Sequence, residues 1–197
     1  MTQPYGESLR LGKALISLGS NATSPAGGPV ETIQAAISSL DDGPFEILAR
    51  SRLYVSPFVP KGAEPDVVNA VVEVSTPLDP AMILARLHKI ETSFDRIRRE
   101  RWTNRTLDLD LLTLDQMILP DQPTLREWVN LPFDKQKSAT PEELILPHPR
   151  LQDRAFVLVP AADIAPDWRH PLLDRTIREM LDALPDDVVS PVRPLDP

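Results

Sequence analysis

The sequence predicts an α+β fold in which helices cover an antiparallel sheet. Short runs of apolar and β-branched residues alternate with two segments that carry apolar residues at helical spacing, and a Pro residue stands where each of those segments begins. The chain has 197 residues, of which 42% are hydrophobic, so it is long enough to bury a sizeable core. We therefore expect a single domain over residues 1–197.

The first strand and the first helix are predicted near the N-terminus. Residues 13–18 form a short apolar run that ends at Gly19, which is typical of a buried strand. Pro29 stands where the first turn of a helix tolerates proline, and the turn-forming residues 41–44 would end that helix. The apolar residues at helical spacing between them are Val30, Ile33, Ile37 and Leu40.

Three more strands and a second helix follow. Residues 45–54 and 67–74 are apolar and β-branched, and residues 106–114 begin with the alternation of a strand. Asp79 is a favourable helix N-cap, and Pro80 a favourable first helical residue. The apolar stripe of this second helix consists of Ile83, Leu87, Ile90 and Phe94. The order β-α-β-β-α-β predicts two right-handed split βαβ halves, which is the ferredoxin-like arrangement.

The C-terminal part is expected to add to this core. It contains an apolar segment at residues 156–159 and a helical pattern near residues 174–184. Proline is concentrated in other stretches, which favours loops or extended connections. We expect a long insertion loop over residues 119–143 and a Pro-rich tail over residues 185–197.

Composition argues against several classes of protein. A formal net charge of −8 does not suit a general nucleic-acid or anionic-membrane binder. The absence of Cys excludes disulfides and thiolate metal sites, and three widely spaced His residues argue against zinc. The N-terminus lacks the regions of a signal peptide, and no stretch approaches the roughly 18 apolar residues of a membrane span. We expect a cytoplasmic protein that binds neither nucleic acid nor membrane.

Positive charge is nevertheless concentrated in one segment. Five Arg residues fall within residues 96–105 of this acidic chain, between the end of the second predicted helix and the last predicted strand. The segment has no periodic apolar pattern, so we place it on a loop. The planar guanidinium group suits phosphate oxygens, and such a loop could therefore hold a phosphate-bearing ligand.

Two carboxylates follow this loop directly. Strand alternation sends Asp108 and Asp110 to one face of the predicted strand and the neighbouring leucines to the other. Adjacent carboxylates repel each other, and a cation relieves that repulsion. Magnesium is bound in proteins by one or two carboxylates together with substrate phosphates and water. Taken alone, however, the pair could equally mark a solvated strand face and the arginines a solvated loop.

Residues 101–110, Arg-Trp-Thr-Asn-Arg-Thr-Leu-Asp-Leu-Asp, resemble the signature of the 6-hydroxymethyl-7,8-dihydropterin pyrophosphokinase family. The matches that follow in family order are residues 19–21 (Gly-Ser-Asn), 54–57 (Tyr-Val-Ser-Pro), Asn69-Ala70, Glu91, 146–150 (Leu-Pro-His-Pro-Arg), 154–160 (Arg-Ala-Phe-Val-Leu-Val-Pro) and 163–166 (Asp-Ile-Ala-Pro). The resemblance covers roughly residues 13–173, which would be the core of the domain.

This resemblance implies transfer of pyrophosphate from ATP to the pterin hydroxymethyl group, giving AMP and the pterin diphosphate. Asp108 and Asp110 would hold two magnesium ions that bridge the ATP phosphates. The residues that match catalytic positions are Arg96, Arg98, Arg105, Asp108 and Asp110. Those that match ATP contacts are Glu91, Arg96, Arg98, Arg101, Trp102, Arg105, His148 and Arg154. The chain would act as a monomer or weak homodimer.

The resemblance also implies a pterin pocket formed by Ser56, Pro57, Asn69, Trp102 and Phe156. Asn69 would bind the edge of the pterin, and Phe156 would stack on its ring. Without the resemblance, Asn69 could equally have a structural role, Phe156 would be core, and His148 would be a loop residue. We interpret Tyr54 and Trp128 as structural, and His88 and His170 as surface or hydrogen-bonded histidines.

Three features depart from the family pattern. Asp95 stands where a glycine usually precedes the arginine loop, which puts the rate of loop closure in doubt. Val67 stands where an aromatic residue usually faces the pterin, so one stacking face is lost. The connection over residues 119–143 is longer than expected and could be an ordered flap, a disordered loop or a contact to another chain.

Two alternatives to the enzyme remain at this point. A non-catalytic paralogue that binds nucleotide or a protein partner would explain the changes at Asp95 and Val67, but retention of both aspartates and the arginines argues against it. An RNA-binding ferredoxin-like module would need exposed sheet aromatics and a basic surface, and the sequence has neither.

Overall fold

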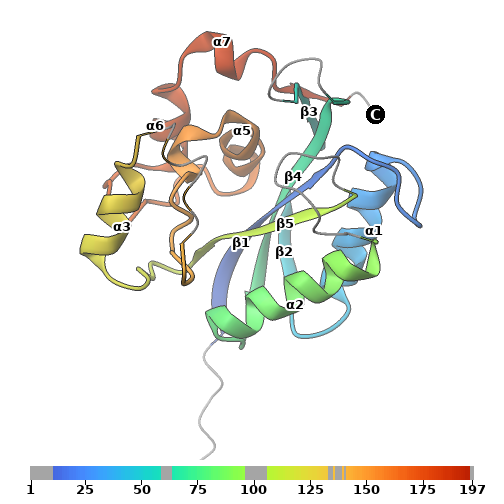
Figure 1. Ribbon diagram of the computed structural model, residues 1–197, viewed down its shortest axis with the longest axis horizontal. Helices are drawn as coiled ribbons and strands as arrows, with labels where there is room; N and C mark the ends of the chain where they lie inside the picture. Colours follow the sequence, from blue (N-terminus) through green and yellow to red (C-terminus); the bar gives the residue numbers. More distant parts are fainter. Residues whose placement is uncertain are drawn as a thin grey trace, which may run out of the picture.

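An antiparallel sheet forms the centre of the protein, and helices lie on both of its faces (Figure 1). The structure is a computed structural model that describes residues 11–58, 64–95, 106–132, 135, 139 and 141–195. Its strands are β1 (Gly12–Ser20), β2 (Glu46–Arg50), β3 (Tyr54–Ser56), β4 (Val67–Thr76), β5 (Asp108–Leu114) and β6 (Arg193–Pro194). Their order across the sheet is β5-β1-β4-β3-β6, and β2 also pairs with β4. This order confirms the predicted ferredoxin-like arrangement.

Two helices cover one face of the sheet. They are α1 (Pro29–Asp41) and α2 (Pro80–Ser93), and both begin at the predicted proline. The Asp79 carboxylate accepts a hydrogen bond from the Met82 N–H at 2.8 Å, which confirms the predicted cap. Between these helices and the sheet lies one of the protein's two apolar cores, whose side chains include Ile16, Leu18, Ile33, Leu40, Val72, Ile83, Leu87 and Ile90. The predicted apolar stripes of the two helices therefore lie in this core.

The opposite face is covered by C-terminal elements. Helix α5 (Ala155–Ile164) contains the predicted apolar segment, and α6 (Ile177–Asp182) lies within the predicted helical pattern. Figure 1 shows both helices on the side of the sheet away from α1 and α2. Their side chains pack on Leu15, Val71 and Leu112 of the sheet. Because neighbouring strand residues face opposite sides, each central strand contributes to both clusters.

The prediction of one strand over residues 45–54 is wrong, because the structure has two. Between β2 and β3 the Ser51 Oγ accepts the Val71 N–H at 3.0 Å, which replaces a normal strand contact. The Arg52 N–H points away from the sheet and donates to the Asp163 carboxylate at 3.2 Å. A side chain more than a hundred residues away therefore interrupts the strand.

The predicted insertion loop and tail both contain regular structure. Within residues 119–143, α3 (Gln122–Val129) is capped by Asp121, whose carboxylate accepts the Thr124 N–H at 2.8 Å, and it buries Leu125 completely. In the tail, α7 (Asp186–Val189) is followed by β6, which pairs with β3. The 3-10 turn η1 (Leu151–Asp153) precedes α5. In the part of the chain described here, no helix is long and apolar enough to cross a membrane.

His170 is fully buried, and of its two predicted interpretations, surface or hydrogen-bonded, the structure supports the second. Its Nδ1 accepts the N–H groups of Leu172 and Leu173 at 3.1 and 3.2 Å, and its ring meets Trp168 edge-on. The proton of the neutral ring is therefore on Nε2, for which the described residues provide no acceptor. Burial lowers the pKa of His170 to about 4.

We expect this histidine to make the protein sensitive to mild acid. An unfolded His has a pKa of about 6.5, so below that pH the unfolded chain binds a proton that the folded chain does not, and stability falls until about pH 4. Between pH 7 and pH 5 the loss from this group is on the order of 2 kcal/mol. In denaturant titrations at the two pH values, His170→Asn should lose less stability than the wild type. An equal loss in both proteins would contradict the assignment.

Candidate active site

A row of four residues crosses the sheet at one end. Asp108 of β5 lies opposite Gly19 of β1, Gly19 opposite Asn69 of β4, and Asn69 opposite Tyr54 of β3. Directly opposite residues in antiparallel strands point to the same face. Val71, two residues from Asn69, packs in the α5 cluster, so this row lies on the α5 face. The sheet thus brings residues from four distant parts of the chain into one line.

Asp108 and Asp110 form one end of the site. Both side chains are half-buried on the same face, as the strand alternation predicts. Between them, the Leu109 N–H donates to the Glu91 carboxylate of α2 at 2.8 Å, and Glu91 is only 2% exposed. This hydrogen bond between α2 and β5 helps to hold β5 in place. The Arg154 guanidinium lies 3.5 Å from the Asp110 carboxylate, so the start of α5 meets the aspartate pair.

His148 lies beside this end of the site. Its backbone N–H donates to the Leu112 carbonyl at 2.8 Å, and its Nδ1 accepts the Arg150 N–H at 3.1 Å. The ring proton is therefore on Nε2. Burial, followed by the positive charges of Arg154 and Arg150, lowers the pKa of His148 to about 3 despite the opposing charge of Asp108. The side chain is neutral at pH 7 and offers one N–H donor.

Asn69 forms the other end of the site. Its Nδ2 donates to Ser56 Oγ and to the Val67 carbonyl, both at 2.9 Å. Because a carbonyl can only accept, these bonds fix the orientation of the amide, and Oδ1 faces Gly19. Asn69 and Ser56 are 4% and 5% exposed, so this polar pair is held in the protein interior. An oriented acceptor at this position can recognise an N–H group on the edge of a ligand.

Gly19 separates the two ends. A Cβ atom at Gly19 would lie 3.7 Å from Val67 Cγ1, 3.8 Å from Asn69 Oδ1 and 4.0 Å from Asp108 Cβ. It would therefore project over the part of the sheet between Asp108 and Asn69, which we call the floor of the site. Because Gly19 has no side chain, the floor stays open, and a ligand can lie across both ends.

Phe156 lies in the first turn of α5, the helix that packs on this face of the sheet. It is 38% exposed, although its neighbours in the helix are buried, and the Arg154 guanidinium lies 5.7 Å from the centre of its ring. Pro57 follows Ser56 at the end of β3 and is half-buried. An exposed ring on the helix that covers this face, together with the buried asparagine of β4, suits a flat heterocycle.

The arginine loop cannot be placed in this site. Arg96, Arg98, Arg101, Trp102 and Arg105 lie outside the described residues. The residues on either side of the loop are described. Asp95 has a φ angle of 58°, in the left-handed region that favours glycine, so the departure from the family pattern is at a position that suits glycine. On the other side, the Ser20 Oγ donates to the Thr106 carbonyl at 2.6 Å.

Two features of the site were missed by sequence reasoning. Gly19 was interpreted only as part of a matching motif, and its place between Asp108 and Asn69 depends on the pairing of strands far apart in sequence. Arg150 was not assigned a role, yet it lies close enough to lower the pKa of His148, and burial and Arg154 lower the pKa of Arg150 itself. Its position between His148 and Arg154 in the sequence was the available signal.

Comparisons with known proteins agree with this arrangement. Residues 15–166 match the sequence model of the family described as 7,8-dihydro-6-hydroxymethylpterin-pyrophosphokinase (HPPK). A 2-amino-4-hydroxy-6-hydroxymethyldihydropteridine pyrophosphokinase from Synechocystis sp. is 35% identical over 92% of this chain and 80% of its own length. The enzyme of that name from Pseudomonas aeruginosa is 36% identical, over 88% of this chain and 92% of its own.

Solved structures support the fold alone. The wild-type HPPK-DHPS of Plasmodium falciparum with pteroate has a TM-score of 0.60 and 16% identity, over 90% of this chain. This chain spans only 43% of the length of that protein. The family match over most of the chain, together with relatives above 30% identity, shows that the chain belongs to the 7,8-dihydro-6-hydroxymethylpterin-pyrophosphokinase family.

Proposed function

We propose that this chain transfers pyrophosphate from ATP to 6-hydroxymethyl-7,8-dihydropterin, giving AMP and the pterin diphosphate, a step of folate biosynthesis. The observation that carries the proposal is the row from Asp108 through Gly19 to Asn69. It provides a carboxylate end for metal and phosphates, an amide end for a heterocycle, and an open floor between them. Nothing in the described residues or the comparisons favours a non-catalytic paralogue.

The aspartate pair fits magnesium that is bound together with ATP. The two carboxylates share one face, and the described residues contain no cluster of three or more His, Cys, Asp or Glu side chains that could hold a metal without other ligands. Magnesium commonly has one or two carboxylate ligands and completes its shell with phosphate and water. We propose that Asp108 and Asp110 hold two ions, which would neutralise phosphate charge when bound.

The remaining ATP contacts are assigned to cationic and N–H groups. Arg154, beside Asp110, can reach phosphate oxygens at the carboxylate end, and neutral His148 can donate through Nε2–H. Glu91 is proposed to support the ATP site from α2, where its carboxylate accepts the Leu109 N–H between the two aspartates. The loop residues Arg96, Arg98, Arg101, Trp102 and Arg105 keep their predicted ATP roles, and Trp102 also its role at the pterin.

The pterin is assigned to the asparagine end. Asn69 Oδ1 would accept from an N–H group on the pterin edge, and Ser56 and Pro57 would line the pocket. Phe156 would cover one face of the ring from above. This placement directs the hydroxymethyl group across Gly19 toward the phosphates.

The products define which bonds change. The hydroxymethyl oxygen forms a bond to the β-phosphorus of ATP, the bond from that phosphorus to the oxygen bridging to the α-phosphorus breaks, and AMP leaves with that oxygen. The hydroxyl proton is lost to solvent or to a departing phosphate oxygen. Catalysis of this kind depends mainly on positioning and charge neutralisation. The site provides both, because the sheet fixes the two ends and Arg154 adds positive charge.

The direct test is a coupled assay for AMP with and without 6-hydroxymethyl-7,8-dihydropterin. We expect AMP only when ATP, magnesium and the pterin are all present. Formation of ADP in place of AMP would indicate transfer of a single phosphoryl group and contradict the proposal. Nucleotide binding without any product would support the non-catalytic alternative. A cytoplasmic location, a single domain and a monomer or weak homodimer remain predictions.

Val67 allows a test of the pterin pocket. It lies on the same strand face as Asn69, opposite Ser56, so its side chain borders the proposed pterin site. We expect Val67→Tyr to tighten pterin binding by up to roughly tenfold, because an aromatic ring adds a second stacking surface. The measurement is a pterin titration in the presence of a non-hydrolysable ATP analogue. The ATP affinity should not change, and weaker pterin binding by a folded variant would show that Val67 does not face the ring.

A further inference from the structure

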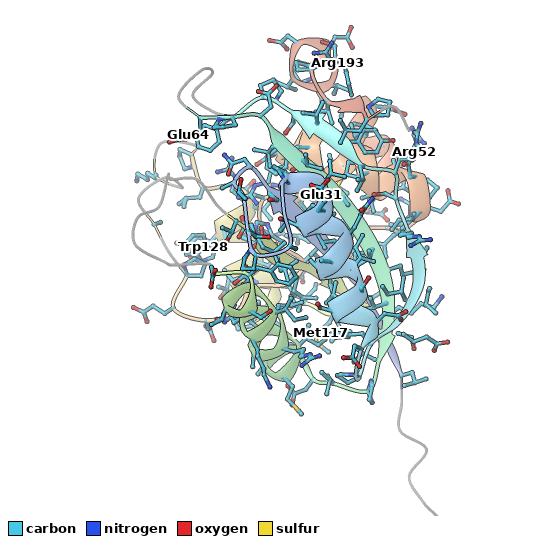
Figure 2. The ribbon with its side chains drawn as sticks, turned by 90° about the vertical axis from the view of Figure 1, so that its right-hand side faces the viewer. Glu31, Arg52, Glu64, Met117, Trp128 and Arg193 are labelled. Carbon is cyan, nitrogen blue, oxygen red and sulfur yellow. The ribbon has the colours of Figure 1, made fainter. Side chains whose placement is uncertain are left out.

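A network of hydrogen bonds joins the C-terminal end of α5 to the start of β3. The Asp163 carboxylate accepts from the backbone N–H of Arg52 at 3.2 Å, from its Nε at 3.2 Å and from its Nη2 at 3.0 Å. The Tyr54 hydroxyl lies 2.9 Å from both oxygens of the same carboxylate. Figure 2 labels Arg52 at the edge of the sheet that faces the orange C-terminal helices. We name Arg52, Tyr54 and Asp163 the α5–β3 clamp.

The clamp is more than a surface ion pair. Tyr54 is 2% exposed, and the side chain of Asp163 is 22% exposed, although that of Arg52 is 66% exposed. Burial acts to raise the pKa of Asp163, but the hydrogen bonds from Arg52 and Tyr54 outweigh it and lower that pKa. The carboxylate is thus charged and fully engaged, and three of its donors come from one residue with a fixed geometry.

The strand that the clamp holds has little other support. β3 pairs with β4 over three residues and with β6 over only two. A ladder this short fixes the position of a strand weakly. The distance between β3 and α5 therefore depends on the side chains that connect them, and the clamp provides the polar part of that connection.

Both clamped elements border the proposed pterin pocket. Phe156 lies seven residues before Asp163 on α5, a distance of roughly 10 Å along a helix. Tyr54 is the register partner of Asn69, and Ser56, two residues further along β3, accepts from the Asn69 amide. A shift of α5 relative to β3 would change the space between Phe156 and Asn69. At the aspartate end, which lies across β1 on the same face of the sheet, Arg154 would move with α5, but Asp108 and Asp110 belong to β5 and would stay in place.

We propose that Asp163, held by Arg52 and Tyr54, is a positioning residue for the heterocycle. It sets the spacing between α5 and β3 so that Phe156 can stack on the same ring whose edge Asn69 binds. This inference rests on the proposed function, because the heterocycle it concerns is the pterin. The clamp acts through Phe156 and Asn69 and does not contact the substrate itself.

The test compares ligand affinities of clamp variants with those of a core variant. Asp163→Ala removes the acceptor, Tyr54→Phe removes one donor, and Asp163→Asn keeps the shape with a weaker acceptor. Ile177→Val is the control, because Ile177 is fully buried in the same cluster as α5 and its change lowers stability away from the clamp. Pterin is titrated with a non-hydrolysable ATP analogue present, the analogue is titrated alone, and thermal unfolding is recorded for each protein.

Asp163→Ala is expected to weaken pterin binding roughly tenfold and to weaken binding of the ATP analogue clearly less, because Arg154 is the ATP contact on α5 that would move with the helix. Tyr54→Phe and Asp163→Asn should have intermediate effects, and Ile177→Val should leave both affinities unchanged. Equal losses of both affinities, or pterin losses that follow thermal stability in all four variants, would overturn the inference. If the wild-type protein binds pterin and the variants bind it equally well, only this inference fails. If the wild type binds no pterin, the proposed function fails with it.

Discussion

Asp108→Asn and Asp110→Asn are each expected to lower turnover by roughly 10²–10³-fold without unfolding the protein. Each change removes one negative charge and one proposed magnesium ligand from the carboxylate end of the site. The Asp110 change also removes the partner that lies 3.5 Å from Arg154. Leu109 and Leu111 point to the other face and stay buried, so the core is unaffected. The fold should therefore remain while the chemical step fails.

The metal dependence gives a more specific measurement. In the activity that either variant retains, the magnesium concentration for half-maximal rate should rise, because one of the two proposed carboxylate ligands is lost. Calorimetry of the wild type should detect tight magnesium binding only when an ATP analogue is present. Tight binding without nucleotide would show that the ion does not depend on substrate phosphates, and the assignment of the pair would be wrong.

Asp115→Asn is a matched control just after the same strand. The Asp115 carboxylate accepts the Lys13 N–H at 2.9 Å, at the opposite end of β5 from Asp108. Its φ angle of 48° is in the left-handed region, which Asn tolerates, and the Asn oxygen can accept the same hydrogen bond. Turnover should stay within about twofold of the wild type. A loss as large as that of the Asp110 variant would mean that strand stability, and not metal binding, explains both results.

Local patterns predicted much of this fold correctly. The proline and cap at Asp79 and Pro80 mark the start of α2, and strand alternation places Asp108 and Asp110 on one face. These features depend on nearest neighbours along the chain and on fixed side-chain periods. Such information is present in the sequence itself.

Long-range contacts account for what local patterns did not predict. The break between β2 and β3 depends on Arg52 meeting Asp163, 111 residues later. The position of Gly19 opposite Asp108 depends on the pairing of β1 with β5, whose register shifts between Leu15 and Ile16. These two features are set by packing between distant segments. Helix α3 is different: Leu125, Trp128 and Val129 do follow helical spacing, but the helix has only eight residues and lies in a proline-rich stretch, which favours the interpretation as a loop.

Gly19→Ala is expected to lower kcat/KM by roughly 10–10²-fold while leaving stability nearly unchanged. The added methyl group would meet its nearest neighbours at 3.7–4.0 Å, which is ordinary van der Waals contact, so the empty site can accommodate it. It would project over the floor between Asp108 and Asn69, where the pterin hydroxymethyl group and the phosphates are proposed to meet. Since it intrudes at the junction of both ligands, the affinity for each should fall when the other is already bound.

Gly12→Ala, at the other end of β1, is the control with the opposite expected result. A Cβ there would lie 3.0 Å from Leu114 Cδ1 and 3.3 Å from Asp115 Oδ2, which is too close without a shift of those side chains. That variant should therefore lose stability in denaturant titrations but keep the kcat/KM of its folded fraction, because Gly12 is far along the strand from the site. If Gly19→Ala keeps full activity, the floor between the two ends is not where the substrates meet. If both variants lose stability and activity together, the effect of Gly19 is structural and the reacting groups must meet elsewhere on the sheet.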